Sequence, residues 1–499
     1  MIAIPPSLVA EIDRAAEPLL GLSVDTLMAR AGEAIAREVG AHLAPPATVL
    51  LLCGKQNNGG DGYAAATLLH KAGYRALAVD VFGEGQTGEV GRRYLDAYRA
   101  AVGEPISLAK AEAVTADILV DAVLGTGARL PLYGAALLAA DLIRKSSAYK
   151  IAVDLPLGVD AEGGRCDPHA AAADLTVSLG FHKVGLFSYP ARGYLGRIVR
   201  DDLGLDTEEL RSAFDLPDRL TGLSDIPSLL PARAPDAHKG SFGHLLILAG
   251  SHRYRGAALL ATASALRMGA GLTTLSSCPA VLSAAATYTP EAILTETPTT
   301  KEATLALLAG KSAVLVGPGY GVCPALAELL TTLLSCEGAP LVLDADALTA
   351  LVKYGLLPLL KMAKRKVILT PHPGEFARLT DLSTAEVQAD RLALARRFTE
   401  EYPVTLLLKG AGSIVSEGEE YAVNTTGGPA LAKGGSGDVL AGAVASLVAS
   451  GVPPYDACRL AALLHGAAGD LAAGRFSPIG VRPSDLPAMM AELLAEGKR

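Results

Sequence analysis

A short apolar run, a glycine-containing turn and a longer amphipathic stretch recur in this order along both halves of the sequence. This alternation is typical of parallel β-sheets covered by helices on both faces. We therefore expect an α/β fold in each half. The predicted strands are residues 48–53, 76–82, 118–124, 150–154 and 175–179 in the first half, and residues 245–249, 272–276, 313–316, 340–344, 367–370 and 404–408 in the second. The predicted helices include residues 7–20, 24–41, 63–72 and 134–145.

The chain length of 499 residues exceeds what one compact core normally accommodates and suits two domains. The strand and helix rhythm stops between residues 206 and 237, where charges and prolines replace it. We place the boundary inside this stretch, with one domain at residues 1–215 and the other at residues 216–499.

Composition indicates small-molecule partners. The net charge of -8, the lack of tryptophan and the aromatic content of 5% disfavour a nucleic-acid surface. The most apolar late run, residues 439–455, is shorter than the roughly 20 residues of a membrane span, so we predict a buried helix there and no membrane partner. Six cysteines without CxxC spacing argue against a zinc site and a disulfide framework. Together with an N-terminus unlike a signal peptide, they predict a cytoplasmic protein.

The segment LAKGGSGDVLAG, residues 431–442, predicts an anion-binding turn. Glycines at 434, 435 and 437 let backbone amides turn inward, and the N-terminus of the following helix adds partial positive charge. Asp438 in such a turn can accept a proton from a substrate hydroxyl during phosphoryl transfer. A purely structural helix start is the alternative reading.

A second candidate site opens at CGKQNNGGDGYAAA, residues 53–66, directly after the first predicted strand. Loop amides and a helix N-terminus would lie there at the carboxyl edge of the sheet, where ligands of open α/β folds bind. The segment lacks the GK[ST] of a P-loop. Asp121 and Asp154 end two further predicted strands on the same edge and serve either a ligand site or turn capping.

These motifs carry a resemblance to two known families. NNGGDG, VDAVLGTG and VDLP resemble the YjeF N-terminal family, the epimerases of hydrated NAD(P)H, called NAD(P)HX. The second half is similar to the ADP- or ATP-dependent NAD(P)HX dehydratases, on the signatures KGSFGHLLILAGS, RGAALLATASALRMGAGL, LVGPGYG, LVLDADAL, LTPHPGEFARL, LLKGAGSIV and KGGSGDVLAG. The resemblance implies a Rossmann-like three-layer αβα epimerase domain followed by a ribokinase-like α/β dehydratase domain. Together they would repair NADHX and NADPHX.

For the dehydratase, the resemblance implies Mg²⁺ and a nucleotide as cofactors. The fused two-domain form favours ADP as the nucleotide, and ATP is the alternative. Asp438 would deprotonate the substrate hydroxyl, which is then phosphorylated so that phosphate can leave. The hydrate would contact Ala257, Gly321, His372 and Asp438, and the nucleotide Lys409, Gly410, Ala411, Gly412, Ser413 and Gly437. Asp344 and Asp346 could form a metal pair or serve a nucleotide loop, and we assign them neither role.

For the epimerase, the resemblance implies Asp154 as the acid/base. The hydrate would lie against Asn57, Asn58, Gly59, Gly60, Asp61, Gly125, Thr126, Gly127, Ala128, Arg129, Leu130, Pro131 and Asp154. The family also binds K⁺ through the equivalents of Asn58 and Asp121 and a Ser or Thr where this chain has Leu157. A leucine side chain cannot ligate K⁺, so a backbone oxygen or water would have to replace it.

The same motifs are compatible with two alternative functions. The second half could be a ribokinase-like hydroxyl kinase for a small molecule, which shares the GSGD turn and base. The first half could be a non-catalytic YjeF-type binding domain fused to it. A stable phosphorylated product would favour the kinase. Family resemblance further predicts a homo-oligomer.

Overall fold

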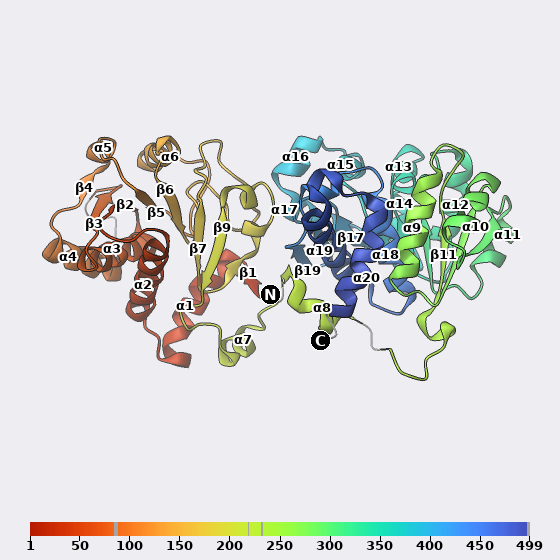
Figure 1. Cartoon of the computed structure of the whole chain (residues 1–499), viewed down its shortest axis with the longest axis horizontal. Helices are drawn as coiled ribbons and strands as arrows, with labels where there is room; N and C mark the ends of the chain where they lie inside the picture. The colour runs from red at the N-terminus through yellow and green to blue at the C-terminus, as the bar shows by residue number, and fades with distance from the viewer. Residues whose placement is uncertain (84–87, 218, 231–232, 497–499) are drawn as a thin grey trace. The chain divides into compact units, whose positions relative to one another are not determined.

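The computed structural model describes residues 1–83, 88–217, 219–230 and 233–496 (Figure 1). The chain divides into two compact units, Ile2–Arg219 and Met1 with Leu220–Arg499. The boundary predicted between residues 215 and 216 falls shortly before this division, after helix α7 (Glu208–Phe214). Within the described ranges, no helix combines the length and apolar character required to cross a lipid bilayer.

The N-terminal unit is built on a seven-stranded sheet whose neighbouring strands are all parallel. The five strands predicted for this half are all present. The sheet order is β4 (Ile106–Ser107), β3 (Arg75–Asp80), β2 (Thr48–Cys53), β5 (Ile118–Ala122), β6 (Tyr149–Val153), β7 (Leu175–Leu179) and β9 (Arg197–Asp201). A separate parallel pair joins β1 (Ala3–Ile4) to β8 (His182–Lys183).

Helices cover both faces of this sheet because alternate residues of each buried strand point to opposite sides. On β2, Val49 and Leu51 pack in one core cluster with residues of α2, α3 and α4, whereas Leu50 and Leu52 pack with residues of α6. The helices of this unit are α1 (Pro6–Leu20), α2 (Val24–His42), α3 (Gln56–Lys71), α4 (Glu89–Ala101), α5 (Leu108–Ala111), α6 (Ala135–Lys145) and α7. This three-layer αβα arrangement is the predicted one.

Helix α3 begins at Gln56 and not at residue 63, so the prediction of a glycine-rich loop at NNGGDG is wrong. The glycines lower intrinsic helix propensity, but tertiary packing requires them. A Cβ at Gly59 would lie 2.1 Å from the carbonyl oxygen of Gly54, and a Cβ at Gly60 would lie 2.5 Å from the sulfur of Met28. The motif therefore forms the first turns of a helix pressed against its neighbours.

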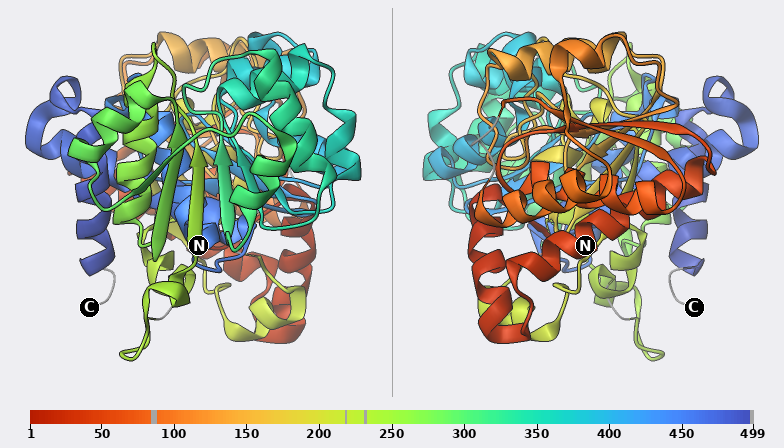
Figure 2. Two further views of the ribbon diagram at one scale, coloured as in Figure 1. Left: turned by 90° about the vertical axis from the view of Figure 1, so that its right-hand side faces the viewer. Right: turned by 90° about the vertical axis from the view of Figure 1, so that its left-hand side faces the viewer.

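The C-terminal unit is built on a ten-stranded sheet that stands between two layers of helices (Figure 2, left). Its strands run parallel from β13 to β17, but β18 pairs antiparallel with both β17 and β19. The expectation of a purely parallel sheet is therefore wrong at this end. The sheet order is β10 (Leu220–Thr221), β19 (Glu420–Asn424), β18 (Ile414–Glu417), β17 (Thr405–Leu408), β16 (Val367–Leu369), β15 (Leu341–Leu343), β14 (Ala313–Val316), β11 (His244–Leu248), β12 (Leu272–Ser277) and β13 (Ile293–Glu296).

The apolar run at residues 439–455 is buried as predicted, but it is not one helix. Helix α18 ends at Ala449, and Gly451 (φ 91°) and Pro453 separate it from α19. The helices of this unit are α8 (Ile226–Leu229), α9 (Arg255–Arg267), α10 (Pro279–Tyr288), α11 (Lys301–Leu308), α12 (Pro324–Ser335), α13 (Asp346–Lys353), α14 (Pro358–Met362), α15 (Pro373–Thr380), α16 (Thr384–Ala389), α17 (Arg391–Glu401), α18 (Ser436–Ala449), α19 (Pro454–Gly480) and α20 (Leu486–Glu496).

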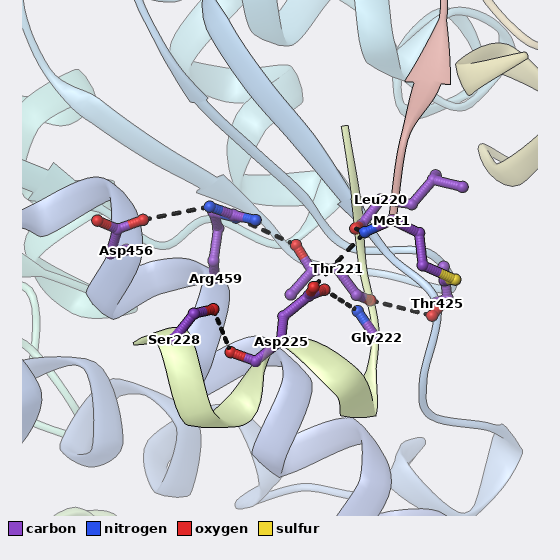
Figure 3. A network of polar contacts seen from close by, with 9 residues as sticks. All are labelled: Met1, Leu220, Thr221, Gly222, Asp225, Ser228, Thr425, Asp456 and Arg459. Atoms are coloured by element: carbon purple, nitrogen blue, oxygen red, sulfur yellow. Dashed lines mark hydrogen bonds and ion pairs between the residues drawn. The ribbon is translucent and has the colours of Figure 1, made fainter. Parts of the chain in front are cut away.

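A polar network anchors the short edge strand β10 (Figure 3). The amino group of Met1 donates to the carbonyl of Leu220 at 2.7 Å and lies 3.5 Å from a carboxylate oxygen of Asp225. Arg459 of α19 donates to the hydroxyl of Thr221 at 3.3 Å. The first residues of the C-terminal unit are thereby held against a helix of its core layer.

Candidate functional site

A cavity of about 470 Å³ lies in the N-terminal unit at the carboxyl ends of its strands. Its wall includes Asn57, Asn58, Asp61, Gly125, Thr126, Gly127, Ala128 and Asp154, which the sequence predicted as ligand residues. The other predicted residues, Gly59, Gly60, Arg129, Leu130 and Pro131, are not part of the wall as far as the described residues show it. The structure thus brings together the ends of three predicted loops around one space.

Asp154 follows β6 in a left-handed conformation (φ 68°) and is only 8% exposed. Its carboxylate accepts a hydrogen bond from the ammonium of Lys183 and one of 3.3 Å from the amide of Leu179. Lys183 is 1% exposed and also donates to the carbonyl of Leu179 at 2.8 Å. Lys183 was not predicted from the sequence; it lies beside Asp154 because it follows β7, the strand that pairs with β6.

Two further carboxyl groups, those of Asp61 and Asp13, line the same cavity. Burial raises the pKa of Asp61 well above its ordinary value, and the charges of Asp154 and Asp13 raise it further. Burial also raises the pKa of Asp13 on α1 to about 6. Burial thus favours the protonated forms of Asp61 and Asp13, beside an Asp154 carboxylate that Lys183 contacts. The cavity therefore contains groups able to donate and to accept a proton.

Of the three K⁺ ligands that the family resemblance implies, the side chain of Leu157 does not fit the role. The side chain of Leu157 is fully buried in an apolar cluster, and its amide donates to the Asp121 carboxylate at 2.7 Å. The carbonyl of Leu157 accepts from the amide of Ala171 at 3.0 Å. Leu157 thus presents an N–H to Asp121 where a K⁺ ligand would present oxygen.

In the C-terminal unit, Asp438 lies in the first turn of α18, behind Gly435 in a left-handed conformation (φ 103°). Burial raises the pKa of Asp438 to about 7, and the nearby carboxylate of Asp344 contributes to the shift. A carboxyl group with this pKa at a helix N-terminus can act as a general base near neutral pH.

A buried ion pair lies beside the glycine-rich turn that contains Asp438. Lys409 Nζ lies 2.7 Å from Asp344 Oδ1 and 4.0 Å from Glu375 Oε2. It also lies 3.3 Å from the position that a Cβ at Gly437 would occupy, so the ammonium sits beside the glycine-rich turn. Asp344, to which the sequence alone assigns no role, is therefore part of this candidate site. The LDADAL motif was the available signal, but it did not indicate which partner Asp344 would meet.

The predicted hydrate contacts of this unit occupy neighbouring turns. His372 caps α15, since its Nδ1 accepts from the Gly374 amide at 3.0 Å and its own amide donates to Glu375 at 2.8 Å. Glu375 therefore caps the helix in return. The amide of Gly321 donates to Asp346 at 2.8 Å. A Cβ at Gly319 would lie 2.8 Å from that of Ala257, so the GPGYG turn lies against the start of α9.

The predicted nucleotide loop, Lys409 to Ser413, follows β17 and is partly exposed. Within the part of the chain that the structure describes, the amides of Gly410, Ala411, Gly412 and Ser413 donate to no protein acceptor. Backbone amides without a protein acceptor are available to bind an anion.

These two units define a two-domain α/β enzyme with a separate site in each domain. The family described as YjeF-related protein N-terminus matches residues 24–185, and that described as NAD(P)H-hydrate dehydratase matches residues 245–491. The bifunctional NAD(P)H-hydrate repair enzyme of Moorella thermoacetica is 34% identical to this chain, and the alignment covers 95% of this chain and 93% of the relative. The enzyme of the same description from Escherichia coli K12 is 32% identical, over 95% of this chain and 90% of the relative. The chain belongs to the family of bifunctional NAD(P)H-hydrate repair enzymes.

Solved structures agree with this assignment for the second domain. An ADP/ATP-dependent NAD(P)H-hydrate dehydratase from Bacillus subtilis, co-crystallized with ATP/Mg²⁺, is 29% identical. The match covers 57% of this chain and 99% of that chain with a TM-score of 0.50. The ribokinase-like fold expected from the resemblance is therefore confirmed.

Proposed function

We propose that residues 1–215 epimerise NAD(P)HX and that residues 216–499 dehydrate it to NAD(P)H at the expense of a nucleotide. The observation that carries this proposal is the placement of Asp438, with a pKa of about 7, at the N-terminus of α18 beside the Lys409–Asp344 pair. This arrangement suits removal of a proton from a substrate hydroxyl near neutral pH.

In the dehydratase, Asp438 takes the proton of the C6 hydroxyl, and the oxygen attacks the terminal phosphorus of the nucleotide, whose shortened form leaves. The C6–O bond then breaks with the electron pair going to phosphate, while the lone pair of the ring nitrogen stabilises C6. Loss of a proton from C5 restores the double bond of NAD(P)H. Phosphorylation thus replaces hydroxide by a better leaving group.

The unpaired amides of the Lys409 to Ser413 loop and the Gly437 amide would bind the nucleotide phosphates. Ala257, Gly321 and His372 would hold the hydrate. Mg²⁺ would offset phosphate charge, and it usually binds through phosphates and water with few protein ligands. That mode fits this chain, since the described residues contain no cluster of three or more His, Cys, Asp or Glu arranged for a metal ion. ADP and ATP are both candidate donors.

In the epimerase, we assign acid and base roles to the carboxyl groups of the cavity. Asp61, whose pKa burial raises well above its ordinary value, donates a proton to the C6 hydroxyl, which leaves as water while the ring nitrogen supplies electrons. Water then adds to the opposite face of the planar C6 and gives a proton to Asp154, which Lys183 orients. Inversion at C6 results, and proton exchange between the carboxyl groups resets the site.

A recovery assay tests both halves. Purified protein is added to mixed NADHX epimers with Mg²⁺ and either ADP or ATP, and the near-ultraviolet absorbance of NADH is followed. We expect complete recovery for the wild type, recovery of only the S fraction for Asp154→Asn and none for Asp438→Asn. A stable phosphorylated product without NADH would instead indicate a hydroxyl kinase. The cytoplasmic location and the homo-oligomeric state stay predictions.

A further inference from the structure

The guanidinium of Arg391 is buried directly beneath the proposed nucleotide loop. Arg391 is the first residue of α17, and its side chain is only 1% exposed. One terminal nitrogen donates to the carbonyl of Ala411 at 2.6 Å, and the other donates to the carbonyls of Leu408 and Lys409 at 3.2 Å each. One side chain thus holds three carbonyl groups that bracket the start of the loop.

Burial of this cation is the only influence resolved on its pKa. Among the described residues, Arg391 forms no ion pair, and its Nε has no hydrogen-bond acceptor. Burial lowers the pKa of the guanidinium to about 10. A buried unpaired cation is costly to a fold. The three carbonyl dipoles compensate part of this cost, so the position demands an explanation other than stability.

The contacts of Arg391 determine which way the loop faces. Because a trans peptide points its carbonyl and its N–H in opposite directions, the carbonyls of residues 409 and 411 that face the guanidinium turn the amides of residues 410 and 412 away from it. Gly410 has a φ of 148°, and a Cβ there would lie 2.8 Å from a terminal nitrogen of Arg391. Arg391 and Gly410 therefore fit each other as a pair.

We propose that Arg391 is a positioning residue for the nucleotide: it fixes the Lys409 to Ser413 loop with its amides presented to the phosphate groups of a nucleoside di- or triphosphate. The proposal rests on the nucleotide-binding role assigned to this loop under the proposed function. A planar guanidinium can bond carbonyls in two directions at once, whereas a lysine ammonium cannot reproduce that geometry.

The test compares Arg391→Met, Arg391→Lys and Gly410→Ala in the full chain. The KM values for ATP, ADP and the S epimer, kcat and the melting temperature are measured with Mg²⁺ present. We expect all three variants to raise the nucleotide KM by about tenfold, with much smaller changes in kcat and in the KM for the hydrate. Arg397→Met, which changes an exposed arginine on the same helix, is the matched control. Epimerase activity monitors the other domain.

Three results would overturn the proposal. An unchanged nucleotide KM in Arg391→Met would do so, as would a near-wild-type Arg391→Lys, because charge alone would then suffice. Equal rises in both KM values together with a lower melting temperature would indicate a purely structural role. If Arg391→Met does not fold, Gly410→Ala decides by the same criteria, since it disturbs the contact from the loop side. Failure of the proposed function itself is distinct: the wild type would then show no nucleotide-dependent dehydration.

Discussion

The pKa of Asp438 leads to a pH prediction for dehydration. Only the ionised carboxylate can accept the hydroxyl proton, so a pKa of about 7 predicts that kcat falls as pH drops below neutrality. At one pH unit below the pKa, we expect about a tenfold loss relative to the alkaline plateau. The measurement is kcat on the S epimer at saturating nucleotide across this range, corrected for spontaneous decay of the hydrate.

An Asp344→Asn variant checks the cause of that shift. The Asp344 carboxylate is the largest charge contribution that raises the pKa of Asp438, so its removal moves the midpoint of the kcat profile to lower pH. A profile without an acid limb in the wild type would show that Asp438 is not the base of the rate-limiting step.

Lys183 leads to a second prediction at the residue scale. Lys183→Met removes the ammonium that contacts the Asp154 carboxylate, and we expect the epimerase kcat to fall about 100-fold with a smaller change in KM. Dehydration of the S epimer stays at the wild-type rate. Lys145→Met, at an exposed position of α6, is the control. Wild-type epimerisation by Lys183→Met would remove Lys183 from the mechanism.

At the scale of elements, the sequence predicts buried parallel strands well and glycine-rich helix starts poorly. Strand β14 is a continuous apolar run, and β7 alternates apolar with hydroxyl residues, so the bounds of both follow from local pattern. The start of α3 does not, because Gly59 and Gly60 favour a loop locally and are helical only through packing on Gly54 and Met28. The β18–β19 hairpin carries charged residues at its turn, and its two strands were therefore not predicted from the sequence.

The candidate site residues also divide into those that the sequence reveals and those that it does not. Asp154 and Asp438 end a strand or open a helix, so motif and position reveal them. Lys183 and Arg391 come from elements distant in sequence and show no local signal. Their partners depend on the pairing of β7 with β6 and on the packing of α17 beside β17, which the local sequence does not show.

The turn after β6 leads to a prediction about ions. Because Leu157 offers an amide to Asp121 in place of an oxygen, we expect exchange of K⁺ for Na⁺ to change neither the epimerase rate nor the melting temperature. Thermal melts and initial rates in matched chloride salts measure this. A rise in melting temperature that is specific to K⁺ and lost in Asp121→Asn would contradict it.

At the scale of the whole molecule, each domain contains its own acid or base, and none of the proposed catalytic side chains is shared between the two units. In the proposed reaction, the S epimer is the compound that passes between the sites. It is a product of the epimerase site and the substrate of the dehydratase site. Separate sites linked by a diffusible compound should work equally well on separate chains.

We therefore predict complementation between two inactive halves. Asp154→Asn alone recovers NADH from the S fraction, and Asp438→Asn alone recovers none. An equimolar mixture should convert both epimers completely, at a rate limited by the slower site and proportional to each protein when the other is in excess. Time courses of NADH formation at varied ratios measure this, with spontaneous epimerisation determined in the absence of Asp438→Asn. Recovery that halts at the S fraction in the mixture would mean that the intermediate is not released, because the epimerase would then have to pass its product to the dehydratase of its own chain.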